Sequence, residues 1–261
     1  MIRGWTSCSR ASAFGSNASG PRSYRSAGVT GMTADPSLLT LLQFADGLFP
    51  AGGFAHSFGL ETYVQDGRVR DRQDLEAFVA AHLEGSAGPA DAAAAAIAVG
   101  IARRDDPQEW IELDARLDAM KSVPEFRLAS RQMGRQALRI AVGIRDDPFL
   151  ARLAAVVQDG RAAAHHATVF GAAVGREGAD PERAATAYLY ASASLLVGAG
   201  LRLIALGQLD GQRVLAAMRG RIGRLAAAAA TARADELWSF NPALEIAGIR
   251  HATLDMRLFR S

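Results

Sequence analysis

Three residue types that cooperate in many hydrolases lie together near the start of the folded part of the chain. They are His56, Ser57 and Glu61. A serine nucleophile needs a histidine within hydrogen-bond reach and an acid that orients that histidine. Adjacent residues on a helix point in different directions, and the G-x-S-x-G turn that exposes such a serine is missing. The spacing therefore argues against hydrolase chemistry here.

Metal binding is a second chemistry that histidines support. The five histidines are His56, His82, His165, His166 and His251. The adjacent pair would point about 100° apart on a helix, and the chain has neither an H-E-x-x-H motif nor a cysteine pair. We predict no metal site within one chain, although a site shared across a symmetric subunit contact stays open. The alternative interpretation is an enzyme or metal-binding protein that uses His56, Glu61 and His166.

Nucleotide chemistry is not indicated. The chain has no G-x-x-x-x-G-K-[ST] loop to hold phosphates, and its single lysine, Lys121, is not part of one. We therefore expect no nucleotide hydrolysis by this chain, and we predict no catalytic residue in it.

Arginines recur every four residues at positions 127, 131, 135 and 139. On a helix this spacing places them in one row, where unpaired like charges repel one another mildly. The row is either a solvated face or a stripe that binds a partner protein, with Arg131 and Arg135 at its centre.

A proline- and glycine-rich break positions the first group of side chains. Pro50 fixes one backbone angle, while Gly52 and Gly53 permit left-handed conformations. Apolar residues at helical spacing lie on both sides of this break. The pattern predicts a sharp turn between two helices, with Ser57 as the N-cap of the second.

The composition predicts an all-α protein. Hydrophobic residues make up 49% of the chain, alanine runs occur at 92–96 and 226–230, and alternating strand patterns are scarce. Alanine is the best helix former because ordering it costs no side-chain entropy. We expect a single compact helical bundle of about ten helices.

Charge and cysteine content exclude several classes of protein. The formal net charge is +2, and the first 31 residues carry four arginines and no acid, which leaves −2 for the remainder. A folded part that is nearly neutral does not indicate nucleic-acid binding. The one cysteine, Cys8, excludes an internal disulfide and fits a reducing compartment such as the cytoplasm.

The chain divides into three parts. Residues 1–34 are rich in serine, glycine and arginine, which predicts a disordered leader or a misassigned extension ahead of Met32. Residues 35–234 form the helical domain, and residues 235–261 form an apolar tail. Within the domain, Asp-Pro pairs at 106–107, 147–148 and 180–181 predict helix starts. Gly88-Pro89 predicts a helix end, and Ser122 with Glu125 predicts a capping box.

Residues 184–201 form an uncharged stretch, and its length is at the lower limit of what can span a membrane. Their alanines, serines and glycines are only weakly apolar, so we expect the central buried helix of a bundle and no membrane association. Arg202 closes this segment and needs a partner if it is buried.

The tail contains a high proportion of large apolar residues for a chain end, among them Trp238, Phe240, Leu258 and Phe259. Chain ends usually fray unless they are docked. We therefore expect the tail to be buried on its own body or on another protein.

Several stretches resemble the urease accessory protein UreF family, in the family's order from Leu38 to Ser261. The break resembles the family's Leu-Pro-x-Gly-Gly-Phe-x-His-Ser-x-Gly-Leu-Glu signature, and the chain's end resembles Arg-His-Glu-Thr-x-x-x-Arg-Leu-Phe-x-Ser. Phe49, Ala167, Glu245 and Ala252 depart from the family's usual residues. The predicted signature or partner-binding residues are Pro50, Gly52, Gly53, His56, Ser57, Gly59, Glu61, Arg131, Arg135, Arg202, Gln208, Arg250, His251, Arg257, Leu258 and Phe259.

The resemblance implies an all-α protein that forms a homodimer and binds two other accessory proteins, UreD (also called UreH) and the GTPase UreG. Together they would insert nickel into the urease apoprotein, with GTP hydrolysed by UreG. It implies no catalysis by this chain and no tightly bound cofactor, since nickel would be handled by the complex. It also implies that the tail becomes ordered when UreD binds.

Overall fold

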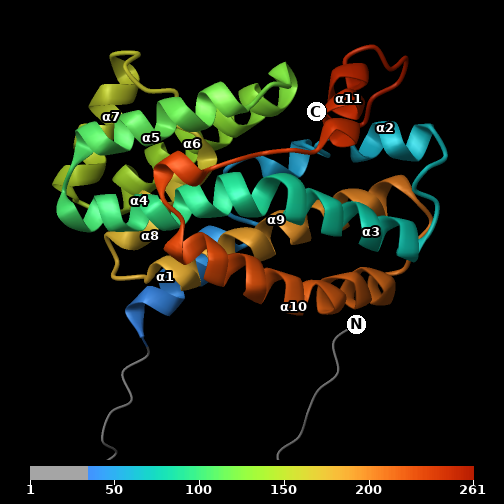
Figure 1. Ribbon diagram of the computed structural model, residues 1–261, viewed down its shortest axis with the longest axis horizontal. Coiled ribbons are helices and arrows are strands. Elements are labelled where there is room, and N and C mark those ends of the chain that lie inside the picture. Colours follow the sequence, from blue (N-terminus) through green and yellow to red (C-terminus); the bar gives the residue numbers. More distant parts are fainter. Residues whose placement is uncertain (1–34) are drawn as a thin grey trace, which may run out of the picture. The chain divides into compact units, whose positions relative to one another are not determined.

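The computed structural model describes residues 35–261, and the predicted leader, residues 1–34, lies outside them. The described chain is mainly helical, with no strand (Figure 1), and residues 35–261 belong to one compact unit. The prediction of a single all-α domain is confirmed. The α-helices are α1 (Pro36–Ala45), α2 (Leu60–Gln65), α3 (Arg72–His82), α4 (Ala93–Arg104), α5 (Pro107–Met120), α6 (Pro124–Ile144), α7 (Pro148–Gln158), α8 (His166–Gly175), α9 (Pro181–Leu203), α10 (Gln208–Thr231) and α11 (Pro242–His251). Short 3-10 helices are η1 (Gly53–Ala55) and η3 (Ala234–Glu236), and η2 (Leu83–Ala92) is a π-helix.

Three helices begin where the Asp-Pro pairs predict. The carboxylates of Asp106, Asp147 and Asp180 accept hydrogen bonds from the backbone N–H groups of the first turns of α5, α7 and α9. Each proline follows at the first helical position, where no N–H is needed. These starts are local, because donor and acceptor are at most three residues apart.

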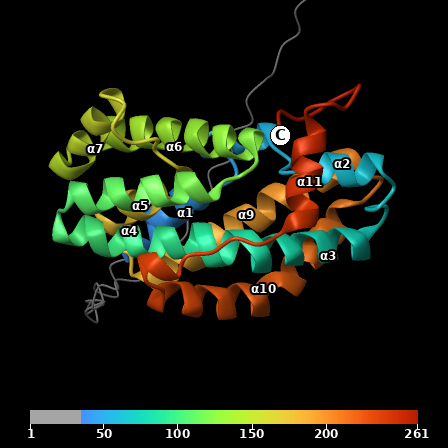
Figure 2. The same cartoon turned by 45° about the horizontal axis from the view of Figure 1, so that its top comes forward.

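The uncharged segment forms most of α9, which packs between α10 on one side and α4 and α8 on the other (Figures 1 and 2). Among the described residues, Pro181–Leu203 and the continuous helical run Arg72–Arg104 are long and apolar enough to cross a membrane. In their most apolar windows 50% and 72% of the residues, respectively, are buried inside this protein. Such burial is typical of the core helices of a helical domain.

The chain does not break at Gly88-Pro89, so that prediction is wrong. Instead the π-helix η2 joins α3 to α4 without interruption. Proline cannot donate to the carbonyl four residues earlier, which is that of Gly85. In this structure the Gly85 carbonyl accepts the N–H of Phe240 at 2.8 Å, and the Asn241 side chain donates to the Ala81 carbonyl at 3.0 Å. The tail thus supplies the donors that the distorted helix lacks.

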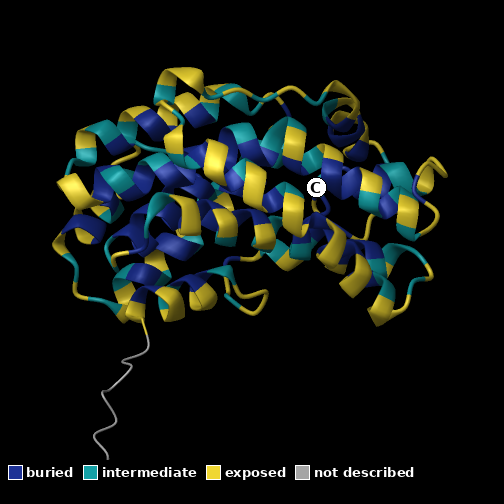
Figure 3. Ribbon diagram, turned by 60° about the horizontal axis from the view of Figure 1, so that its bottom comes forward, coloured by how far each residue is buried: buried dark blue, intermediate teal, exposed yellow. Residues whose placement is uncertain are grey.

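Burial follows the helix faces (Figure 3): inward faces are buried and outward faces are exposed. A very close contact lies between α4 and α8, where a β-carbon placed on Gly171 would come within 2.0 Å of the Ala95 carbonyl oxygen. Only glycine allows two helices this close, so α4 and α8 pack backbone against backbone.

Candidate functional site

The glycine-rich break binds the last residues of the same chain. Gly52 and Gly59 adopt left-handed conformations, with φ of 92° and 84°, and Gly59 is the N-cap of α2. The prediction that Ser57 is this N-cap is wrong. The Ser57 hydroxyl donates instead to the Ser261 carbonyl at 2.8 Å, a contact between residues 204 positions apart.

Ser261 is fully buried by this segment. Its carbonyl also accepts the backbone N–H groups of Ser57 at 2.6 Å and Phe58 at 3.0 Å. Its hydroxyl lies 2.9 Å from His56 Nδ1. The polar groups of the break therefore face the tail.

Glu61 holds the residues just before Ser261. The residue is only 2% exposed, and its carboxylate accepts the N–H groups of Leu258 at 2.6 Å and Phe259 at 3.1 Å. His251 Nε2 lies 3.0 Å from the same carboxylate. Hydrogen bonds to an ionised acceptor are about twice as strong as neutral ones, so Glu61 is the main anchor of the tail.

His251 connects this anchor to α6. Its Nδ1 lies 2.7 Å from a Glu125 oxygen, and Arg257 pairs with the other Glu125 oxygen at 3.2 Å. The predicted capping box of Ser122 and Glu125 is therefore wrong. The N-cap of α6 is Val123, whose apolar side chain cannot accept a hydrogen bond, and the Glu125 carboxylate faces the tail instead of the start of the helix.

Arg202 is stacked between two aromatic rings. Its guanidinium carbon lies 3.9 Å from the ring centre of Phe54 and 4.2 Å from that of Phe259. It also donates to the Phe54 carbonyl at 2.8 Å. Arginine over an aromatic face is attracted by the ring quadrupole. Arg202 thus joins the end of α9, η1 and the tail.

The remaining predicted residues are distributed around this centre. Arg250 makes a two-pronged pair with Asp66 at 2.7 and 2.9 Å, and this hydrogen bonding lowers the pKa of the Asp66 carboxyl. Arg131 donates to Asp118 at 2.8 Å, and Arg135 donates to the Ala163 carbonyl. Gln208 is the exposed first residue of α10. The arginine row of α6 is therefore partly used inside the molecule.

The alternative metal or catalytic set is not assembled. His166 begins α8, where its ring lies 5.5 Å from that of Tyr188. Burial lowers the pKa of His166 to about 4, and burial together with the charge of Arg260 lowers that of His56 to about 4. Both rings are therefore neutral at pH 7. In the part of the chain that the structure describes, no group of three or more histidine, cysteine or acidic residues could hold a metal ion.

The structure contains a second polar cluster that was not predicted from the sequence. The buried Asp114 accepts four hydrogen bonds, from Thr168 and from the backbone of residues 163–165. Next to it, His165 lies 3.0 Å from Ser130 and 2.8 Å from Asp118. These residues are far apart in the sequence and follow no spacing rule, so no motif could have found them.

The serine, histidine and aspartate of this cluster have the residue types of a catalytic relay. However, the His165 side chain is fully buried, Ser130 is almost so, and Asp118 is already paired with Arg131. The cluster joins α5, α6 and α8, which is a structural use of polar side chains.

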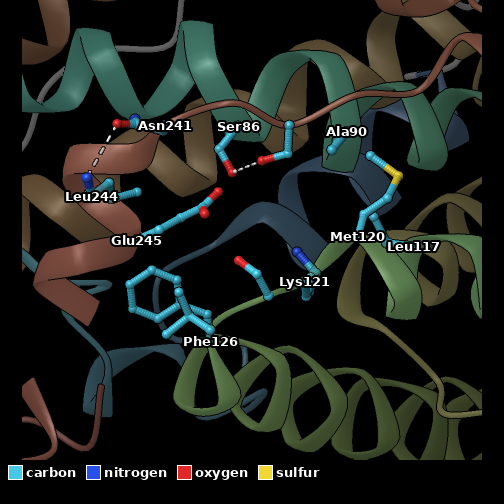
Figure 4. A pocket seen from close by; sticks show the side chains of 12 residues that line it. Ser86, Ala90, Leu117, Met120, Lys121, Phe126, Asn241, Leu244 and Glu245 are labelled. Atoms are coloured by element: carbon cyan, nitrogen blue, oxygen red, sulfur yellow. Dashed lines mark hydrogen bonds between the residues drawn. The ribbon is translucent and has the colours of Figure 1, made fainter. Parts of the chain in front are cut away.

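A small cavity lies where the tail crosses η2 (Figure 4). Its volume is about 40 Å³, enough for one or two water molecules. Lys121 at its wall pairs with Asp91 at 2.7 Å, and the hydroxyls of Ser86 and Ser239 are 3.2 Å apart. The cavity is too small for a nucleotide or an organic cofactor.

The docked tail leaves a large apolar surface outside. Leu244 and Phe259 are buried, but six large apolar side chains are at least half exposed. They are Trp238, Phe240, Ile246, Ile249, Met256 and Leu258. The tail is thus held on the body by polar anchors while many of its apolar side chains face outward.

Fold and site together define an all-α protein in which a glycine-rich segment binds the C-terminal tail of the same chain. A sequence model of the UreF family matches residues 69–219. The urease accessory protein UreF of Arthrobacter sp. (strain FB24) is 36% identical over 234 residues, which cover 85% of this chain and 96% of that protein. That of Bacillus sp. (strain TB-90) is 31% identical over 224 residues, 86% of this chain and 99% of that protein. That of Granulibacter bethesdensis is 34% identical over 232 residues, 89% of this chain and 97% of that protein.

The chain belongs to the UreF family of urease accessory proteins. The resemblance noted in the sequence is thereby confirmed. These relatives are named as accessory proteins and not as enzymes, which fits the prediction that this chain has no catalytic residue.

Proposed function

We propose that this chain is the adaptor of a nickel-insertion complex for urease. In this complex it binds UreD (UreH) and the GTPase UreG in the cytoplasm and helps to deliver nickel to the urease apoprotein. GTP is hydrolysed by UreG, and this chain carries neither a tightly bound cofactor nor a catalytic group. The observation that supports the proposal best is the exposed apolar surface of an otherwise anchored tail, because such a surface favours a protein partner.

Point substitutions on the tail test this proposal without removing its anchors. The double variant Ile249→Asp with Met256→Asp changes two exposed side chains that make no polar contact with the body. We expect it to lose co-purification with UreD, because charges would be buried in an apolar interface. Helical content should stay the same. The matched control is Ile144→Asp, an equally exposed apolar residue on α6. Unchanged capture of UreD by the double variant would contradict the assignment.

A second exposed surface supports the homodimer part of the proposal. Leu38, Leu39 and Leu42 lie on the outer side of α1, which packs on α9, where Tyr190 is also exposed. Apolar faces shared by two helices are typical of symmetric dimer contacts. We expect Leu39→Arg with Leu42→Arg to give a monomer in size-exclusion chromatography with light scattering. A dimer of unchanged stability would refute this surface.

The non-catalytic part of the proposal has a direct measurement. The purified chain alone should hydrolyse no GTP above the rate in buffer, and equilibrium dialysis should detect no tight nickel site in the monomer. Turnover of GTP, or stoichiometric nickel bound by the dimer-disrupted variant, would favour the enzyme or metal-binding alternative.

A further inference from the structure

His251 is the last residue of α11, which packs on α2 and α6 (Figure 2), and it is completely buried. Both of its ring nitrogens lie against carboxylates. Nδ1 is 2.7 Å from a Glu125 oxygen on α6, and Nε2 is 3.0 Å from a Glu61 oxygen on α2. Glu125 also accepts from Arg257, and Glu61 accepts two backbone N–H groups of the tail. We call His251, Glu61 and Glu125 the His251 cluster.

The hydrogen bonds of the His251 cluster need one proton more than a neutral ring and two ionised carboxylates supply. A neutral imidazole has one N–H, so its second nitrogen can only accept, and an ionised carboxylate can only accept as well. Two acceptors that face each other at 2.7 or 3.0 Å repel each other, and burial increases the cost because neither acceptor can be hydrated. Both contacts are hydrogen bonds only when an additional proton is present.

The surrounding charges favour placing that proton on the ring. Among the described residues, Arg257 is the one other cation at ion-pair distance from Glu61 or Glu125, and the neighbouring Arg250 is paired with Asp66 instead. A neutral ring therefore leaves one negative charge uncompensated, whereas a doubly protonated ring balances it. The C-terminal end of α11 also favours a cation, because the last carbonyls of a helix carry partial negative charge.

We propose that a proton closes the tail: docking of residues 252–261 takes up one proton at His251, and loss of this proton as pH rises loosens the tail. In the undocked tail the ring is hydrated and loses its proton near about pH 6.5. Above that pH only the docked tail keeps the proton, so docking weakens with rising pH, by up to about tenfold in its equilibrium constant per pH unit. This control of the tail goes beyond the proposed partner binding and does not depend on it.

Hydrogen exchange of the full chain between pH 7 and pH 9 measures the docking equilibrium. After correction for the intrinsic pH dependence of exchange, protection of residues 252–261 should fall with a slope of up to about tenfold per pH unit, while protection of α4 and α8 stays constant. His56 beside the tail, whose pKa burial lowers to about 4, is neutral in this range and adds no slope. Nitrogen-15 NMR at pH 7 should show a histidine ring with protons on both nitrogens, and His251→Gln should lack this signal.

Glu125→Gln separates the proton from the contacts. Its amide can donate to Nδ1 while a neutral ring donates from Nε2 to Glu61, so both contacts are made without the additional proton. The tail should therefore stay docked at pH 7, and its protection should change by less than about twofold up to pH 9. Glu182→Gln is the matched control, because it makes the same change on an exposed residue of α9, and it should keep the slope of the unchanged chain.

Three results would each overturn the proposal. They are a single N–H on the His251 ring at pH 7, tail protection that does not depend on pH, and an unchanged slope in Glu125→Gln. A fall in protection that is equal in the tail and in α4 would also overturn it, because the proton would then be linked to unfolding of the whole domain. None of these results bears on the proposed partner, since the measurements use this chain alone.

Discussion

Two contacts of this molecule are built on opposite principles. The α4–α8 contact is made of small apolar residues, with the two backbones nearly touching at Gly171. The docked tail is fixed by a few polar anchors around Glu61, Ser57 and Arg202, while large apolar side chains remain exposed. Close apolar packing cannot loosen gradually, whereas polar anchors can be exchanged for water or for a partner. We therefore expect the core contact to set global stability and the tail to open locally.

The largest effect is expected at the core contact. In Gly171→Leu the new side chain overlaps the Ala95 carbonyl, where even a β-carbon would lie 2.0 Å away. We expect a loss of more than about 3 kcal/mol in the free energy of unfolding, measured by urea denaturation. Gly198→Ala on α9 is the control, since a β-carbon there meets nothing within 4 Å. A stable Gly171→Leu protein would show that α4 and α8 can separate.

Acidification should weaken both regions. Burial lowers the pKa of His166 on α8 and of His56 beside the tail to about 4, below the value of 6.5 for an unfolded histidine. The unfolded chain then binds protons first as pH falls, so each of these two neutral histidines contributes stability that is full above pH 6.5 and is lost towards pH 4. Each contributes a slope of up to about 1.4 kcal/mol per pH unit in this window.

Chemical denaturation from pH 7 to pH 4.5 tests this slope. His56→Asn and His166→Asn should each reduce the slope of the free energy of unfolding against pH. For His56→Asn this change should accompany a change in hydrogen exchange of the tail, and for His166→Asn it should accompany unfolding of the body. A free energy of unfolding that is constant or higher at pH 4.5 would mean that neither ring is buried as a neutral group.

Glu61→Gln removes the charge of the main tail anchor and keeps its shape. We expect a loss of about 2 kcal/mol, because the two N–H bonds to Leu258 and Phe259 lose their charge assistance. Hydrogen exchange should rise in residues 252–261 and stay unchanged in α4 and α8. Uniform loss of protection over the whole chain would instead make the tail part of the core.

Arg202→Ala should have the smallest effect, about 1 kcal/mol, through loss of the stacking between Phe54 and Phe259. Arg202→Lys keeps the charge but not the planar stacking and should recover part of it. The two measurements are hydrogen exchange in the tail and co-purification of UreD with each variant. If both variants behave like the unchanged chain, Arg202 does not hold the tail.

Most of the fold was predictable because helix signals are local. Asp106, Asp147 and Asp180 bond to N–H groups two or three residues away, so the sequence alone predicts those starts. The wrong predictions share one cause. At Gly88-Pro89 and at Glu125 the local pattern is outweighed by donors and acceptors of the tail, more than a hundred residues away.

The sequence by itself determined the helical class, the three helix starts at Asp-Pro pairs and the family, because composition, these caps and signature residues can be read in chain order. Only the tertiary structure decided what the signature residues contact. Ser57 meets Ser261 and Glu61 meets His251 across 204 and 190 positions, respectively, and no spacing rule reaches that far. The physical reason is that the pairing of buried polar groups depends on which helices pack together, and that is set by the whole core at once.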